Sequence, residues 1–60
     1  RERECLSWAA RGKTAWETSR ILTVSESAVK KHLATAAAKL DARTRTQAVA
    51  IALQRGLIHP

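Results

Sequence analysis

Residues 14–40 read TAWETSRILTVSESAVKKHLATAAAKL and contain the signals for two consecutive helices. The first signal is Thr14 followed three residues later by Glu17, a T-x-x-E capping box in which each side chain pairs with a backbone N–H of the other residue. Apolar residues at positions 21 and 22 complete this short segment. The pattern therefore predicts a helix over residues 15–22.

A second helix is predicted after the connection Thr23-Val24. Ser25 is a suitable N-cap for this helix, and Glu26 lies in its first turn, where the helix dipole favours negative charge. At about 100° per residue, the apolar residues of the segment 26–40 fall within one narrow arc, which is predicted to face the core. The arc consists of Val29, Leu33, Ala36 and Leu40.

The opposite side of the segment 26–40 is basic in its N-terminal half and carries small side chains elsewhere. It consists of Ser27, Lys30, Lys31, Ala34, Thr35 and Ala38. Two short helices joined by a tight turn, the second with a capped start and a basic outer face, are the parts of a helix-turn-helix. In this interpretation the two lysines supply hydrogen-bond donors in the major groove of DNA, and the alanines leave room for close approach. On periodicity alone, a merely solvated basic face is an equal alternative.

Two further helices are predicted on either side of this pair. Residues 1–11 place Cys5 and Leu6 on one apolar face and end at Gly12, a C-terminal cap. Residues 45–55 form the last helix and end at Gly56. The expected fold class is all-α, a small four-helix helix-turn-helix domain that spans residues 1–60.

The composition favours a helical protein with an anionic partner. The apolar residues include no Phe, Tyr or Met and are mostly Ala, Leu, Val and Ile, which is typical of helix bundles. Eleven Lys and Arg against five Asp and Glu give a net charge of +6, which favours nucleic acid as partner. Two alternatives stay open: a basic helical protein-interaction module and a basic amphipathic helix at a membrane surface. The spacing of the caps favours DNA, because neither alternative requires it.

No pattern of an enzyme or a metal site is found in the sequence. The single cysteine, Cys5, has no partner at disulfide or ligand spacing, and His32 flanks the buried arc, so both are expected to pack in the interior. No apolar run approaches the ~18 residues that a membrane span needs, and no leader peptide is recognised. We therefore expect a cytoplasmic, non-enzymatic domain with no cofactor and no membrane contact.

Further short motifs follow one another along the whole chain. They are Arg1-Glu2-Arg3-Glu4, Leu6, Gly12-Lys13-Thr14, Glu17, Val24-Ser25-Glu26, Val29-Lys30, His32, Lys39-Leu40, Arg45-Thr46-Gln47-Ala48-Val49 and Gly56-Leu57-Ile58. No single motif is specific, but the ordered set closely resembles the LuxR/GerE DNA-binding domain. Trp16-Glu17, one residue after the third motif, together with the Gly56-Leu57-Ile58 ending, is most similar to the quorum-sensing branch, which binds acyl-homoserine lactones. The resemblance implies a sequence-specific DNA-binding domain of a bacterial transcriptional regulator, with the segment 26–40 as recognition helix.

The resemblance also implies which residues contact DNA. The residues expected at base edges in the groove are Lys30, Lys31, Ala34 and Ser27. The residues expected at phosphates are Thr14, Trp16, Ser25, Thr35, Arg43 and Arg45. Trp16 could equally pack between the second and third helices, and an ordinary charged turn is the alternative for the two arginines.

Four positions depart from the family pattern. Thr18 stands where an aliphatic residue usually packs and Ala42 where Val is common, which predicts a slightly under-packed core. Ala28 lacks the hydroxyl with which Thr often touches phosphate. Asp41 replaces a glycine, which predicts a turn closed by the aspartate side chain.

The last predicted helix is apolar on every side at its centre, residues 48–53, and such a helix is normally covered on more than one side. If Ala48, Val49, Ala52 and Leu53 face the first and third helices, an outward stripe remains. This stripe consists of Gln47, Ala50, Ile51 and Gln54. It resembles the self-pairing surface of the family, so we expect a two-fold homodimer that binds an inverted-repeat operator. The resemblance further implies a longer regulator with an N-terminal signal-binding domain, which could be a lactone-binding or a receiver domain.

Overall fold

The computed structural model describes residues 1–59, and Pro60, the last residue of the predicted domain, lies outside this range. Four helices follow one another: α1 (Glu2–Ala10), α2 (Ala15–Leu22), α3 (Glu26–Lys39) and α4 (Arg45–Gln54). Each boundary lies within one residue of the predicted one, and the part of the chain that the structure describes contains no strand. The predicted all-α fold is therefore confirmed.

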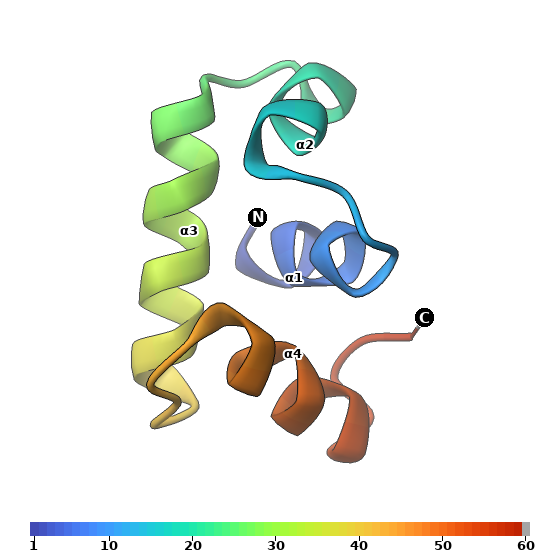
Figure 1. Cartoon of the computed structure of the whole chain (residues 1–60), viewed down its shortest axis with the longest axis vertical. Coiled ribbons are helices and arrows are strands. Elements are labelled where there is room, and N and C mark those ends of the chain that lie inside the picture. The colour runs from blue at the N-terminus through green and yellow to red at the C-terminus, as the bar shows by residue number, and fades with distance from the viewer. Residues whose placement is uncertain (60) are drawn as a thin grey trace.

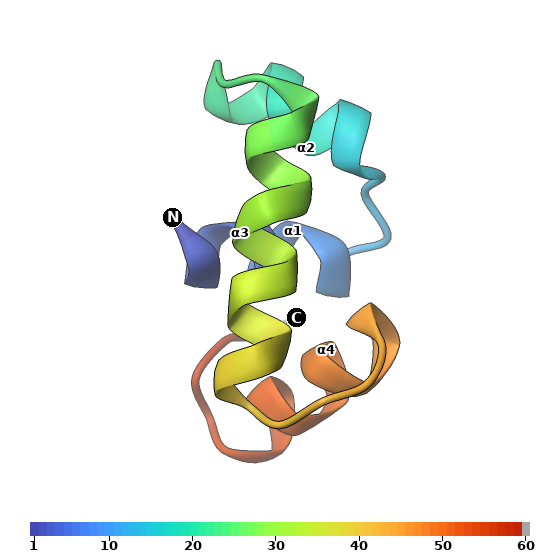
Figure 2. The same ribbon diagram turned by 90° about the vertical axis from the view of Figure 1, so that its left-hand side faces the viewer.

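The longest helix, α3, organises the molecule. In Figure 1 it stands upright along one side, and the other three helices lie on its opposite side. It packs against each of them, and α1 in turn packs against α2 and α4. Figure 2 shows α3 in front of the other elements, so that its outer side is not covered by any part of the described chain.

The core is built mainly from small side chains, which lets the helices approach closely. Its buried apolar residues are Cys5, Leu6, Ala15, Val29, Leu33, Ala36, Ala48, Ala52 and Ile58. The predicted arc of α3 is confirmed, with Leu40 half-buried against the core. The polar Thr18 is only 2% exposed and occupies a core position. The burial of Ile58 was not predicted, because it follows the last helix.

All four helices end in a Schellman motif, in which a residue just beyond the helix adopts a left-handed backbone. These residues are Gly12 (φ 86°), Thr23 (φ 59°), Asp41 (φ 55°) and Gly56 (φ 69°). The following N–H donates back to a carbonyl of the last helical turn, with N···O distances of 3.0 Å at Lys13, 3.0 Å at Val24, 2.8 Å at Ala42 and 2.9 Å at Leu57. The glycine caps predicted after α1 and α4 are thus confirmed.

The turn at Asp41 differs from the prediction. Backbone bonds close it, from Asp41 N to Ala38 O at 3.1 Å and from Ala42 N to Ala37 O at 2.8 Å, and not the aspartate side chain. The chain therefore keeps the geometry of a glycine turn with an L-residue in the left-handed position, where a Cβ is unfavourable. The prediction missed this because Asp adopts both kinds of turn.

The orientation of α4 corrects one further expectation. Ala48 and Ala52 are buried and Val49 is half-buried, as predicted, but Leu53 is 37% exposed and does not belong to the core. Of the predicted outward stripe, Gln47, Ala50 and Gln54 are exposed, while Ile51 is half-buried at its edge. No described helix of this chain is both long and apolar enough to cross a membrane.

Candidate nucleic-acid interface

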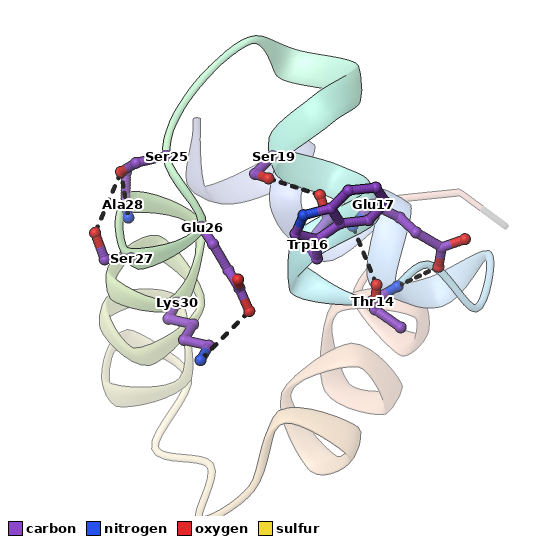
Figure 3. A network of polar contacts seen from close by, with 9 residues as sticks. All are labelled: Thr14, Trp16, Glu17, Ser19, Ser25, Glu26, Ser27, Ala28 and Lys30. Carbon is purple, nitrogen blue, oxygen red and sulfur yellow. Dashed lines mark hydrogen bonds and ion pairs between the residues drawn. The ribbon is translucent and has the colours of Figure 1, made fainter.

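The caps of α2 and α3 hold the two helices in a helix-turn-helix arrangement (Figure 3). Thr14 N donates to Glu17 Oε1 at 2.9 Å and Glu17 N donates to Thr14 Oγ1 at 3.1 Å, which completes the predicted capping box. Ala28 N donates to Ser25 Oγ at 3.1 Å, which confirms the second predicted cap. Residues 23–25 alone connect the helices, so the start of α3 is fixed close to the end of α2.

The outer side of α3 exposes all four residues that were predicted to meet base edges. Ser27, Lys30, Lys31 and Ala34 are exposed, and so is Ala38 one turn beyond Ala34. Thr35 is half-buried and lies about 140° around the helix from Lys30, on the opposite flank of the same side. The uncovered side of α3 therefore carries two lysines followed by short side chains.

A shallow groove of about 480 Å³ runs along one flank of α3. It is lined by Lys30, Leu33, Ala34, Ala37, Ala38, Ala42, Arg43, Thr44 and Arg45. The groove brings Lys30, near the start of α3, together with two arginines from the turn after it. Three cations thus share one surface, which attracts a polyanion.

The turn that carries the two arginines is held by two side chains for which this role was not predicted. Thr44 is the N-cap of α4, and its Oγ1 accepts from Gln47 N at 3.0 Å. Gln47 Oε1 accepts from Arg43 N at 2.7 Å, so the glutamine that was assigned to the dimer stripe braces the basic turn. The signal was present in the sequence, because Thr44 and Gln47 form a T-x-x-Q pattern of the capping-box type.

A second groove, of about 280 Å³, places the N-termini of α2 and α4 next to each other. Its lining includes Lys13 and Thr14 from the first and Arg45 and Thr46 from the second. Free backbone N–H groups and the positive ends of two helix dipoles therefore meet beside two cations. Such a corner is suited to a phosphate group.

Trp16 lies at the surface, on the first turn of α2. Its side chain is 58% exposed and its ring carries the Arg20 guanidinium at 5.8 Å from the ring centre. The alternative that Trp16 packs between the helices is therefore wrong. A third groove, of about 680 Å³, contains Trp16, Ser25 and Glu26 in its lining, so that two predicted phosphate contacts lie together.

Lys30 is engaged within the domain itself. Its Nζ lies 3.5 Å from Glu26 Oε2, one helical turn earlier, and both side chains extend on the side that faces Trp16 and Thr14 (Figure 3). The pair is largely open to solvent. Lys30 can therefore exchange this partner for a ligand without unfolding any structure.

The two residues considered for other chemistry lie away from this surface or inside the protein. Cys5 is fully buried, and this burial raises the pKa of its thiol, which keeps it protonated and unreactive. His32 is half-buried on the far flank of α3. Among residues 1–59, no three side chains of His, Cys, Asp or Glu gather in a way that could hold a metal ion.

Residues 1–52 match the family described as bacterial regulatory proteins, luxR family. The chain belongs to this family. The match covers most of the chain, including α1, the helix-turn-helix and most of α4. The resemblance inferred from the ordered motifs is confirmed.

Relatives in several bacteria share the whole of this region. The chain is 64% identical over 58 residues to the quorum sensing-dependent transcriptional regulator RpaR of Rhodopseudomonas palustris. The matched region covers 97% of this chain and 24% of RpaR. It is 52% identical over 60 residues to the transcriptional activator BjaR1 of Bradyrhizobium diazoefficiens, covering 100% of this chain and 25% of BjaR1. Identity to the transcriptional activator LuxR of Aliivibrio fischeri is 45% over 58 residues, 97% of this chain and 23% of LuxR. The chain spans about a quarter of the length of these relatives, which are regulators of transcription by name.

Proposed function

We propose that this domain binds double-stranded DNA in a sequence-specific manner, with α3 in the major groove. The observation that carries the proposal is the uncovered side of α3, which is continuous with a groove that collects Lys30, Arg43 and Arg45. The width of the major groove admits one α-helix, and cations on either side of it meet the phosphates. Membership of the luxR family supports this function for the domain.

The exposed residues divide between base readout and phosphate binding. Lys30 and Lys31 donate to guanine O6 or N7, while Ser27 and Ala34 are short enough to allow the helix axis to approach the bases. One phosphate is bound at the corner between α2 and α4, by Thr14 and Arg45. The other proposed phosphate contacts are Trp16, Ser25, Arg43 and Thr35. Thr35 lies on the opposite flank of α3 from Lys30.

The regulator is proposed to act as a homodimer on an inverted repeat. Two copies that pair through the exposed side of α4 present their α3 helices about 34 Å apart, one turn of DNA. The full-length protein is proposed to be a cytoplasmic, quorum sensing-dependent regulator, in which a signal-binding domain occupies part of the remaining chain. RpaR, a quorum sensing-dependent regulator about four times as long as this chain, supports this assignment.

Titration of labelled duplexes at several salt concentrations tests DNA binding. Each neutralised phosphate contributes a slope of about −0.9 in log K against log salt, and the cations here allow roughly four to six contacts per protomer. Lys30→Ala and Lys31→Ala are each expected to cost about 1–3 kcal/mol on the preferred duplex and to relax base preference.

Lys39→Ala is the matched control for these variants, because Lys39 ends the same helix and lies 3.0 Å from Glu2 on α1. It is expected to keep the base preference of the parent. An affinity that does not change with salt would exclude the phosphate contacts, and unchanged binding by both lysine variants would exclude α3 as the reading helix.

A further inference from the structure

Glu26 is the one acidic side chain of α3, and it lies at the end of the helix that leads into the proposed DNA groove. Its carboxylate is not isolated: Lys30 Nζ lies 3.5 Å away, and the side chains of Glu26 and Lys30 are 44% and 66% exposed. Figure 3 shows the two side chains reaching toward each other on the side of α3 that faces Trp16. Any duplex that meets Lys30 therefore also meets a carboxylate.

The helix dipole favours an acid in the first turn of α3, but this effect requires no basic partner one turn later. Ser25 already caps α3 by accepting from Ala28 N at 3.1 Å, and an exposed pair four residues apart on a helix adds little to stability. Near a phosphate the carboxylate is repelled, which opposes the attraction due to the net charge of +6. For DNA binding, an acid on this surface is favourable only where it finds a donor, and the donors in the major groove are the amino groups of cytosine and adenine. On adenine the acceptor N7 lies next to the amino group and repels a carboxylate, so cytosine is the better partner.

We propose that Glu26 and Lys30 together read a single C·G base pair, with Glu26 as a specificity-determining residue. Glu26 accepts a hydrogen bond from cytosine N4, and Lys30 donates to guanine O6 or N7. In the base pair these groups are neighbours, because cytosine N4 and guanine O6 are hydrogen-bonded to each other. The ion pair thus matches the base pair donor for acceptor, and neither charge is left unpaired when Glu26 and Lys30 separate to bind it.

The same geometry rejects other bases. A guanine or thymine in place of the cytosine turns a carbonyl oxygen toward Glu26, and an adenine places its acceptor N7 beside the amino group, so that acceptors repel each other in each case. Glu26 therefore lowers affinity for most sequences and spares one. This inference rests on the proposed function, in which α3 lies in the major groove.

The test uses the 60-residue chain and a pool of randomised duplexes, from which preferred sequences are selected. Dissociation constants are then measured for the selected duplex and for variants with each base pair changed singly. The parent is expected to prefer C·G at one position by on the order of tenfold. Glu26→Gln is expected to lose this preference there and to gain adenine, which glutamine recognises through N6 and N7.

Two further variants complete the experiment. Glu26→Asp keeps the charge and the acidic first turn but shortens the reach, and it is expected to lose the preference at the same position. Glu4→Gln removes the same charge from an exposed pair on α1, where Glu4 Oε1 lies 3.6 Å from Arg1, and it is expected to leave every preference unchanged. Lys30→Gln is expected to act at the same base pair as Glu26→Gln.

The outcomes separate this inference from the proposed function. If Glu26→Gln raises affinity uniformly and leaves all base preferences as they are, Glu26 acts through its charge alone and the reading pair is excluded, while DNA binding stands. If the parent itself selects no sequence from the pool, both the proposed function and the reading pair are excluded.

Discussion

Thr23 and Asp41 hold left-handed backbone conformations that glycine adopts without a steric penalty, with φ of 59° and 55°. The Cβ atom makes this region unfavourable by roughly 1–2 kcal/mol for an L-residue, and a β-branched residue such as Thr is rare there. Each residue nevertheless occupies the position that Gly12 and Gly56 take after the other two helices. The domain therefore carries conformational strain at the C-termini of two of its four helices.

Replacement of these residues by glycine is expected to stabilise the domain. Thr23→Gly should raise the free energy of unfolding by about 1 kcal/mol and Asp41→Gly by somewhat less, because Asp tolerates the left-handed region and glycine gains entropy in the unfolded chain. In a domain of this size, 1 kcal/mol corresponds to about 4–8 °C in Tm. Thermal unfolding followed by circular dichroism measures the change.

Gly56→Ala is the matched control in the opposite direction. A Cβ added at Gly56 meets nothing within 4 Å, so its effect reports the backbone conformation and not a steric clash. This variant is expected to lower Tm. Equal Tm values for Thr23→Gly and the parent would mean that the connection between α2 and α3 relaxes the strain in solution.

At the scale of the element, the capping box makes the start of α2 sensitive to acid. The hydrogen bond that the Thr14 backbone N–H donates to the Glu17 carboxylate is the main reason why the pKa of this carboxyl lies below its ordinary value of 4.5. The hydrogen bond with the Thr14 side chain lowers this pKa further. A carboxyl whose pKa is lower in the folded than in the unfolded state stabilises the fold at pH values above its unfolded-state pKa. This stabilisation is lost as the pH falls through the folded-state pKa.

Glu17→Gln is therefore expected to be less stable than the parent at neutral pH and to approach it as the pH falls below about 4. Unfolding in urea at a series of pH values gives the comparison. Thr14→Ser keeps the hydroxyl of the box and is expected to keep the pH dependence. A difference between parent and Glu17→Gln that is the same at pH 7 and pH 3 would contradict an ionic contribution from the box.

The helices and their caps could be predicted from the sequence because they depend on near neighbours. Thr14 and Glu17 are three residues apart, and no other part of the chain is needed to bring them together. The facing of α4 could not be predicted with equal success, because a helix that is apolar all round has no preferred side, and Leu53 was consequently assigned to the core. Its true facing depends on the path of the chain through the turn at Asp41.

The candidate site could likewise be predicted only in part from the sequence. The exposed lysines of α3 follow from its periodicity, since the same helix carries the buried arc. The grooves do not follow from this periodicity. Arg45 lines one groove together with Thr14, which lies 31 positions earlier in the sequence, and Arg43 lines another with Lys30 only because the chain reverses between them. The role of Gln47 as a brace for the turn was missed although its pattern was visible, because the apolar residues around it pointed to a pairing surface.

At the scale of the whole molecule, one face of α4 covers the core and the opposite face of α4 is exposed to solvent. Leu53 is 37% exposed beside Ala50 and Gln54, which are also exposed. The surface is small, and small interfaces give weak association. The isolated domain is therefore expected to be mostly monomeric and to pair when DNA holds two copies side by side.

Ala50→Glu tests this pairing, because Ala50 is exposed and its replacement removes no buried contact. The variant is expected to keep the Tm of the parent and its affinity for a half-site duplex, and to lose cooperative occupation of the full inverted repeat. Ile51→Glu should act in the same direction but is half-buried, so Ala50 gives the cleaner result. Mobility shifts on half-site and full-site duplexes provide the measurement, and cooperative binding by Ala50→Glu would exclude α4 as the pairing surface.

The outer side of α3 has a consequence for how such regulators diverge. Ala34 and Ala38 are exposed, line the groove beside Lys30 and contribute nothing to the buried core. A longer polar side chain at either position would add a new contact to DNA without disturbing the packing that maintains the fold. On the proposed function, these two positions allow descendants of the domain to acquire a different operator while the packing of the fold stays unchanged.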